Sequence, residues 1–300
     1  MPPDSGHIPT AYELYLDKAE WPEQIREEME KKFFASIRLK NGTYKFTYPH
    51  RFDDLNELTK KFLPPVRPLK ILDVAISSGV STLEWTHSLA QAGVDHRMTA
   101  GDATVNCCLL SVGRGLRALT DSTGYPLQFD IYGKAVPNPS GKRNWIARTL
   151  PLMILRTAVA WRRREIQGTG SGLNESQRRL GTELRPIKLV VPRLPESSNL
   201  EIVEDDILTN RSFQASFHVV RAANILNRSY FSESTLIRML RNLRNRLLTG
   251  GLLVVCRTTE QNENQATLFT LDEDNKFGAL ARLGKGSEIE DLILALPAGE

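Results

Sequence analysis

Short apolar runs alternate with longer amphipathic stretches through the centre and the C-terminal part of the chain. Residues 70–76 (KILDVAI) and 252–256 (LLVVC) are almost entirely apolar, as expected of strands that are buried on both faces. Residues 233–248 repeat apolar positions at three- and four-residue intervals, which predicts a helix that Gly250-Gly251 ends. Strands that alternate with helices predict a parallel sheet with helical crossovers.

The same criteria predict the remaining elements of this region. Helices are expected at 81–92 and 105–119, and strands at 97–101, 200–203 and 217–222. Segments 266–271 and 277–283 are predicted as a closing antiparallel pair. The sequence therefore predicts an α/β protein with a Rossmann-like sheet that is mostly parallel and closes with an antiparallel strand.

The N-terminal region is predicted to be a separate helical cap. Residues 10–35 show helical spacing of apolar positions, and Asn41-Gly42 is a short hairpin signal. Phe62-Leu63-Pro64-Pro65 interrupts the pattern strongly. We place the boundary there, with a helical N-terminal region at 1–65 and the main domain at 66–300.

A large insertion is predicted inside the main domain. The gap between the strand at 97–101 and the one at 200–203 is far longer than an ordinary crossover. We place the insertion at about 123–190. Residues 141–190 hold eleven Lys and Arg against three acids, a local charge of +8 in a chain of net charge +4. Such a block favours an anionic partner or a solvated surface.

Composition excludes several other classes. The chain is 41% hydrophobic and 25% charged, which is ordinary for a globular protein. Its three cysteines have no metal-ligand spacing, so no metal site and no disulfide framework are expected. The first thirty residues have no basic-then-apolar organisation. We expect a cytoplasmic protein.

One strand end carries the pattern of a ligand-binding turn. Asp73 lies in the strand at 70–76, and Ser77-Ser78-Gly79 forms a small-residue turn into the next helix, which Ser81-Thr82 is expected to cap. Such a turn lets a ligand approach the backbone, and the helix N-terminus offers N–H groups. Because the G-x-G-x-x-G pattern of dinucleotide sites is absent, a ligand without pyrophosphate is favoured.

Two further strand ends carry acids. Asp102 ends the second strand, where a carboxylate can accept hydrogen bonds from ribose hydroxyls. Glu204-Asp205-Asp206 follows the strand that begins at Leu200, where a carboxylate can bind an adenine amine, and the choice between Asp205 and Asp206 stays open.

These motifs together resemble the class I S-adenosylmethionine (SAM)-dependent methyltransferases. The resemblance rests on Ile71-Leu72-Asp73 through Gly79, Gly101-Asp102, residues 204–208 and 248–256. It implies SAM as the cofactor and a class I methyltransferase sheet. The cofactor-binding residues that it implies are Asp73, Ala75, Ser77, Ser78, Gly79, Thr82, Asp102, Asp205, Asp206, Ile207 and Asn224.

A narrower likeness exists to the bacterial chemotaxis-receptor glutamate methyltransferases. Residues 75–79 are similar to their glycine loop, and 217–226, followed by Tyr230-Phe231, is similar to their fourth-strand motif. This resemblance places Asn224 beside the methyl-transfer centre, as the catalytic residue. The chain departs from that family at Ala75, Ala223 and His218. The family has a glycine, an arginine and an aspartate at these three positions.

We therefore expect a methyltransferase that modifies oxygen or nitrogen of a small or anionic acceptor, with the basic insertion shaping its recognition. A protein glutamate acceptor of chemotaxis type is one alternative. A SAM-binding scaffold without turnover is the other, since Ala75 and Ala223 replace family residues.

The stretch 145–164 is expected to contact a partner. It combines apolar positions with Arg162-Arg163-Arg164 but is too short and too charged to span a membrane. We favour a lid or a dimerisation helix that makes a homodimer; a peripheral contact with the inner membrane is the alternative. No nucleic acid partner is predicted.

Overall fold

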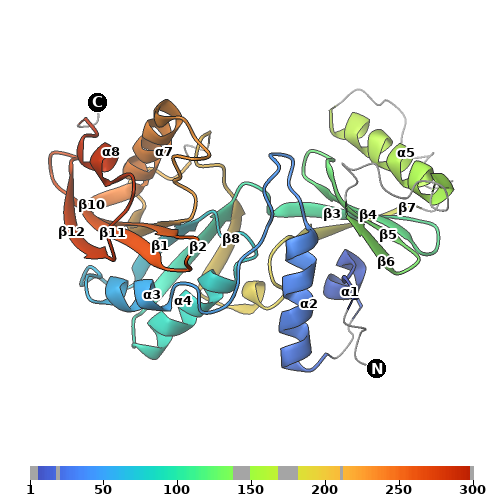
Figure 1. Ribbon diagram of the computed structural model, residues 1–300, viewed down its shortest axis with the longest axis horizontal. Helices are drawn as coiled ribbons and strands as arrows, with labels where there is room; N and C mark the ends of the chain where they lie inside the picture. The colour runs from blue at the N-terminus through green and yellow to red at the C-terminus, as the bar shows by residue number, and fades with distance from the viewer. Residues whose placement is uncertain (1–5, 18–20, 138–148, 168–181, 210–211, 298–300) are drawn as a thin grey trace. The chain divides into compact units, whose positions relative to one another are not determined.

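The computed structural model describes residues 6–17, 21–137, 149–167, 182–209 and 212–297 (Figure 1). The chain divides into two compact units. The antiparallel unit contains Met1–Thr47 and Thr104–Pro192, and the parallel unit contains Tyr48–Ala103 and Arg193–Glu300. The chain therefore passes from one unit to the other three times.

A seven-stranded sheet forms the parallel unit, in the order β12-β11-β10-β9-β1-β2-β8. Its strands are β1 Leu69–Val74, β2 His96–Asp102, β8 Leu200–Glu204, β9 Phe217–Ala223, β10 Leu247–Thr258, β11 Asn264–Leu271 and β12 Phe277–Leu283. Strands β10, β9, β1, β2 and β8 run parallel, whereas β11 is antiparallel to β10 and to β12. This confirms the predicted Rossmann-like, mostly parallel sheet with an antiparallel closing pair.

Helices cover both faces of this sheet. Adjacent residues of a strand point to opposite faces, so Ile71 and Leu72 of β1 belong to two different hydrophobic clusters. The Ile71 cluster includes residues of α3 (Asp53–Lys60) and α4 (Val80–Gln91). The Leu72 cluster includes residues of α7 (Glu233–Arg246) and α8 (Glu290–Leu294). The long apolar runs of the sequence are thus explained by burial on both sides.

The antiparallel unit contains a second sheet of five strands, in the order β6-β5-β4-β3-β7. These strands are β3 Asn106–Val112, β4 Leu116–Asp121, β5 Pro126–Ile131, β6 Lys134–Pro137 and β7 Thr182–Lys188. Each neighbouring pair is antiparallel.

The predicted helix at 105–119 is wrong, because β3 and β4 form a hairpin there. Gly113 and Gly115 both adopt a positive φ, 60° and 89°, in the turn between these strands. Such angles are incompatible with a right-handed helix and are readily accessible to glycine. The apolar positions of this segment are compatible with both the helical period and the alternation of a strand, and the glycine turn decides between them.

Two helices, and not one, form the N-terminal segment. Helix α1 (Ala11–Tyr15) and helix α2 (Glu23–Ser36) replace the single helix predicted at 10–35, of which residues 18–20 lie outside the described part. Thr10 and Glu13 cap α1 reciprocally: the Glu13 amide donates to Thr10 Oγ1, and the Thr10 amide donates to Glu13 Oε2. Pro22 is the N-cap residue that immediately precedes α2.

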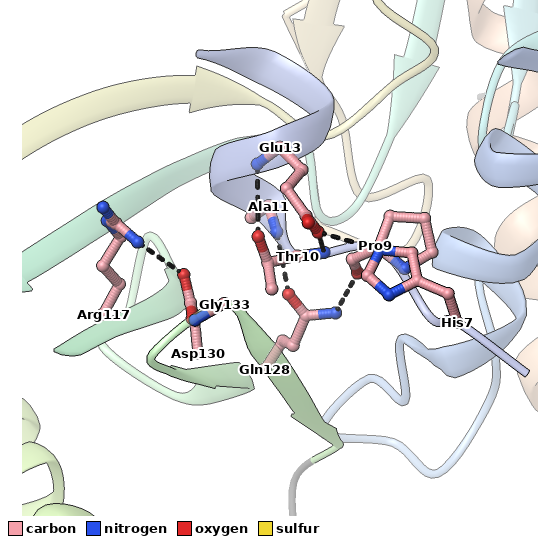
Figure 2. A network of polar contacts seen from close by, with 9 residues as sticks. All are labelled: His7, Pro9, Thr10, Ala11, Glu13, Arg117, Gln128, Asp130 and Gly133. Atoms are coloured by element: carbon pink, nitrogen blue, oxygen red, sulfur yellow. Dashed lines mark hydrogen bonds and ion pairs between the residues drawn. The ribbon is translucent and has the colours of Figure 1, made fainter. Parts of the chain in front are cut away.

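Polar contacts fasten this N-terminal segment to the second sheet (Figure 2). The buried Gln128 side chain of β5 accepts a hydrogen bond from the Ala11 amide at 2.9 Å and donates one to the Pro9 carbonyl at 3.0 Å. Nearby, Arg117 pairs with Asp130 at 2.8 Å and lies over the ring of Tyr12. These contacts explain why residues 1–47 group with 104–192.

The boundaries of the two units differ from the boundaries that the sequence predicts. Residues 48–65, predicted as part of an N-terminal cap, group with the parallel sheet, and the second segment of the antiparallel unit begins at Thr104 and not near residue 123. The 3₁₀ helix η1 (Leu194–Glu196) already belongs to the parallel unit.

Helix α5 (Thr149–Ile166) lies across the face of the second sheet that is opposite to α1 (Figure 1). Phe129 of β5 faces α5, while its neighbour Gln128 faces α1, as strand alternation requires. The first residues of the predicted segment, 145–148, lie outside the described part.

Candidate functional site

The turn between β1 and α4 has an unusual backbone. Ala75, Ser77 and Gly79 all adopt a positive φ, of 57°, 57° and 82°. A left-handed conformation costs a residue other than glycine about 1–2 kcal/mol. Strain of this kind is often found where a ligand is held.

Gly79 is the N-cap residue of α4 and offers no side chain to the first turn of that helix. The predicted cap by Ser81-Thr82 is wrong, because these residues lie inside the helix and Thr82 Oγ1 donates to Asp73 Oδ2 at 2.7 Å. Ser78 is only 2% exposed, and its Oγ has no hydrogen-bond partner among the residues that the structure describes. The helix start thus presents N–H groups and a buried hydroxyl that an external group can satisfy.

Asp73 is buried in an ion pair with Arg221 of β9, which lies directly opposite it in the sheet. Arg221 Nε and Nη2 donate to the two carboxylate oxygens at 2.9 and 2.5 Å. Arg221 also donates to Asn56 Oδ1 and to the Ser81 carbonyl, and its guanidinium lies 4.1 Å from the centre of the Trp85 ring. Asp73 therefore fastens β1 to β9 and to α4.

Asp102 joins the ends of β1 and β2. It is the last residue of β2, and its Oδ2 accepts a hydrogen bond from the Ser77 amide at 2.9 Å. The Asp102 carbonyl accepts a hydrogen bond from the Asp205 amide at 2.9 Å, which ties in the end of β8. Three of the predicted site segments thus meet at one edge of the sheet.

The structure separates the roles of the two acids that follow β8. Asp205 is buried, and Arg246 donates to its two oxygens at 2.6 and 3.0 Å. Asp206 is half-buried, and its Oδ1 accepts a hydrogen bond from the Leu208 amide of its own turn. Ile207 packs into the core beneath α7. Asp205 therefore has a structural role, and Asp206 is the acid that remains available.

Close packing explains two glycines of this edge. A Cβ built on Gly101 would lie 3.0 Å from Asp205 Cβ, and one built on Gly79 would overlap Leu194 Cδ2. Leu194 of η1 thus packs directly on the turn. No pattern in the sequence predicts this contact between distant residues.

Asn224, predicted beside the reaction centre, fastens the end of β9 to that of β10. Its backbone is left-handed, with φ of 58°. Its Oδ1 accepts from the Thr258 amide at 2.7 Å, and its Nδ2 donates to Thr258 Oγ1 at 3.1 Å.

Arg51, which was not predicted from the sequence, also contacts Thr258. Its Nε donates to Thr258 Oγ1 at 3.1 Å, and its guanidinium lies 4.9 Å from the ring centre of Tyr48. Burial lowers the pKa of Arg51. Among the described residues, no carboxylate pairs with Arg51. The half-buried Arg51 cation and Asn224 therefore share a hydrogen-bond acceptor, the Thr258 hydroxyl.

His218 and Cys256 are poor candidates for a catalytic base at this edge of the sheet. His218 lies at the amino end of β9, away from Asn224, and its Nδ1 accepts from the Lys70 amide. Burial, then the Lys70 charge, lowers the pKa of His218. Burial raises the pKa of Cys256 to about 12. The described residues include no cluster of three His, Cys, Asp or Glu that could hold a metal ion.

Comparisons with known proteins give distant likenesses. No protein-family model matches the chain, and no curated protein matches it. Among solved structures, the CMeT domain of the citrinin polyketide synthase aligns over 69% of this chain and 33% of its own, with 14% identity and a TM-score of 0.33. The CurJ carbon methyltransferase aligns over 70% and 35%, with 14% identity and a TM-score of 0.33.

The N-methyltransferase NodS from Bradyrhizobium japonicum WM9, in complex with S-adenosyl-L-homocysteine (SAH), aligns over 71% of this chain and 65% of its own, with 12% identity and a TM-score of 0.32. The [4+2]-cyclase SpnF aligns over 70% and 47%, with 13% identity and a TM-score of 0.32. The alignments thus span between about a third and a half of the lengths of the CMeT, CurJ and SpnF chains.

Proposed function

We propose that this chain is a SAM-dependent methyltransferase whose acceptor is a small anionic molecule. The observation that carries the proposal is the meeting of three segments at the carboxyl edge of the parallel sheet. These segments are the strained turn after β1, Asp102 at the end of β2 and Asp206 after β8. In Rossmann-like folds, ligands bind outside the carboxyl ends of the strands.

The residues of this edge fit the polar groups of SAM. The buried Ser78 hydroxyl has no partner in the described part of the chain, and α4 begins without a side-chain cap. Both features suit the carboxylate of the methionine part. Asp102 would hold the ribose hydroxyls, and Asp206 with Ile207 would hold the adenine. Asp73 and Thr82 would act indirectly, by fixing the turn that contains Ala75, Ser77, Ser78 and Gly79.

Bound SAM supplies a methyl group that is already activated for transfer. The chain must then hold the acceptor in line and exclude water. Arg51 supports an anionic acceptor, because a half-buried guanidinium that pairs with no carboxylate of the described residues is stabilised by an anion from outside. A carboxylate acceptor needs no general base. Asn224 would line the reaction centre in the position that Thr258 fixes.

Calorimetry with SAH tests the cofactor part of the proposal. We expect wild-type protein to bind SAH and Asp102→Ala to bind about tenfold or more weakly, as for the loss of hydrogen bonds to a charged group. Glu201→Gln changes an exposed acid near the amino end of β8, so it serves as the matched control and should bind as wild type does. Absence of SAH binding by the wild-type protein would overturn the proposal.

Labelled SAM and a cell extract test the acceptor part. Label that appears in small anionic molecules, and that Arg51→Gln reduces while SAH binding persists, supports the proposal. Label in protein carboxyl groups instead supports the chemotaxis-type alternative, which rests on the likeness of residues 217–226. Binding without turnover on any fraction supports the scaffold hypothesis, for which the strained Ala75 is the observation.

A further inference from the structure

Helix α5 buries one face of its surface in the antiparallel unit. Leu155 and Val159 are buried in a cluster with Leu110, Phe129 and Ile131 of the second sheet. Residues 155 and 159 are one helical turn apart, so a single stripe of α5 faces the sheet. Leu152 and Ala158, which are partly buried, pack against the same cluster, so these four residues form the sheet-facing side of α5.

A second apolar stripe points outward. Leu150, Met153, Ile154 and Trp161 are 69%, 63%, 40% and 39% exposed. They recur at intervals of three, four and seven residues, which places them on one face of the helix. Single exposed apolar residues are ordinary, but a continuous stripe of large ones marks an interaction surface.

Arginines accompany this outward stripe. Residues 149–166 contain four arginines and one glutamate, a net charge of +3, and the glutamate pairs with Arg162 at 2.8 Å. Arg156, Arg163 and Arg164 are exposed. These three arginines also line a cavity of about 430 Å³ beside α5, whose apolar wall includes Phe129 and Val159. The cavity thus combines cationic side chains, Arg156 and Arg163 among them, with an apolar wall, which suits an anionic group that carries an apolar part.

We propose that α5 docks this protein on the surface of an anionic lipid membrane. The stripe of Leu150, Met153, Ile154 and Trp161 would enter the boundary between headgroups and acyl chains, where tryptophan is favoured. The arginines would lie at the level of the phosphates, and the cavity would take the phosphate of one lipid. None of the described helices is sufficiently long and apolar to cross a bilayer, so the contact is peripheral.

Charge favours a membrane over a second copy of the chain. A symmetric dimer through this face would place two copies of a helix of net charge +3 against each other, since a twofold interface uses one patch on both subunits. The single acid of α5 is already paired with Arg162, so it offers no compensation. An anionic bilayer provides both the apolar environment and the opposite charge.

Sedimentation with lipid vesicles tests the proposal on the full chain. We expect binding to vesicles of phosphatidylcholine with 30% phosphatidylglycerol, about tenfold or more tighter than to phosphatidylcholine alone, and weakened by 0.5 M salt. Equal binding to both vesicles, or to neither, would overturn it.

Two variants locate the contact. Met153→Gln with Trp161→Gln removes apolar area, and Arg156→Gln with Arg163→Gln removes charge; each pair should weaken binding about tenfold or more. The control Leu280→Gln with Leu294→Gln changes two comparably exposed apolar residues of the parallel unit and should leave binding unchanged. Far-ultraviolet circular dichroism shows that each variant is folded.

Outcomes that contradict the proposal are equally specific. If the α5 variants bind anionic vesicles as wild type does, the contact lies elsewhere. If wild type ignores vesicles but is a dimer in solution, and Met153→Gln with Trp161→Gln makes it a monomer, a second copy covers the stripe.

Discussion

Arg221 and Asp73 face each other on adjacent parallel strands and form a two-point ion pair inside the core. Both side chains are almost fully buried. Thr82, Asn56 and the Ser81 carbonyl form further hydrogen bonds with the pair, which compensate in part for the burial of the two charges. The acid of the first strand therefore organises the site from beneath and does not line it.

Breaking this pair should be costly. Asp73→Asn leaves the Arg221 cation buried without its counter-charge, and we expect the free energy of unfolding to fall by about 3–5 kcal/mol. Urea denaturation measures the loss. Arg228→Ala, in the exposed pair with Asp291, is the control and should hardly change the urea midpoint. A variant Asp73→Asn as stable as wild type would show that the pair is dispensable.

The two acids after β8 should respond in opposite ways. Asp205→Asn disrupts the buried pair with Arg246, so we expect it to lower the free energy of unfolding by about 3–5 kcal/mol. Asp206→Asn keeps the oxygen that accepts from Leu208 and should change stability by less than about 0.5 kcal/mol. Under the proposed function, it should weaken SAH binding about tenfold in calorimetry. The reverse pattern would assign the ligand role to Asp205.

Gly79→Ala should be more destabilising than Gly93→Ala. Both glycines have positive φ, but a Cβ at Gly93 meets nothing within 4 Å, whereas one at Gly79 overlaps Leu194. Backbone strain alone predicts a loss of about 1–2 kcal/mol for Gly93→Ala, and the overlap adds about 1–3 kcal/mol for Gly79→Ala. Thermal and urea unfolding compare the two.

A double-mutant cycle separates the overlap from the strain. Leu194→Ala should cost less stability in the Gly79→Ala background than in wild type, because it removes the overlapping methyl group. Additive losses would mean that the backbone simply shifts to accommodate the new Cβ.

Alkaline pH should destabilise the fold through Cys256. Burial raises the pKa of this thiol to about 12, well above its value of about 8.5 in unfolded chains. Between these values the unfolded state has lost a proton that the folded state keeps, so stability falls as pH rises, by up to about 1.4 kcal/mol per pH unit. Unfolding measured at pH 8, 9 and 10 should show this slope in wild type and a shallower one in Cys256→Ala. Identical slopes would contradict the assignment.

Local sequence patterns were sufficient to predict the parallel sheet and its acidic strand ends. The apolar runs that became β1 and β10 and the acids Asp73, Asp102 and Asp205 are local features of the sequence. The partners of these acids are not local. Arg221 is 148 residues from Asp73 in the chain, and Arg246 is 41 residues from Asp205. As long as the arginine partners are unknown, an acid that holds the fold together cannot be distinguished in the sequence from an acid that binds a ligand.

The antiparallel unit was harder to predict for a related reason. The segment of β3 and β4 is compatible with either period until Gly113 and Gly115 are interpreted as a turn. The attachment of the N-terminal segment depends on Gln128, more than a hundred residues from the Pro9 and Ala11 groups that it binds. Arg221 lies in the apolar run of β9, and a charged residue in such a run indicates that a buried residue of opposite charge pairs with it.

The buried amide of Gln128 also limits how this architecture can be inherited or rebuilt. A chimera that exchanges only residues 104–192 would leave the Pro9 carbonyl and the Ala11 amide facing a foreign strand. A truncation that removes Pro9 and Ala11 would leave the buried Gln128 amide without these two hydrogen-bond partners. The N-terminal arm and the distant segment therefore form one module in two pieces, which recombination must carry together.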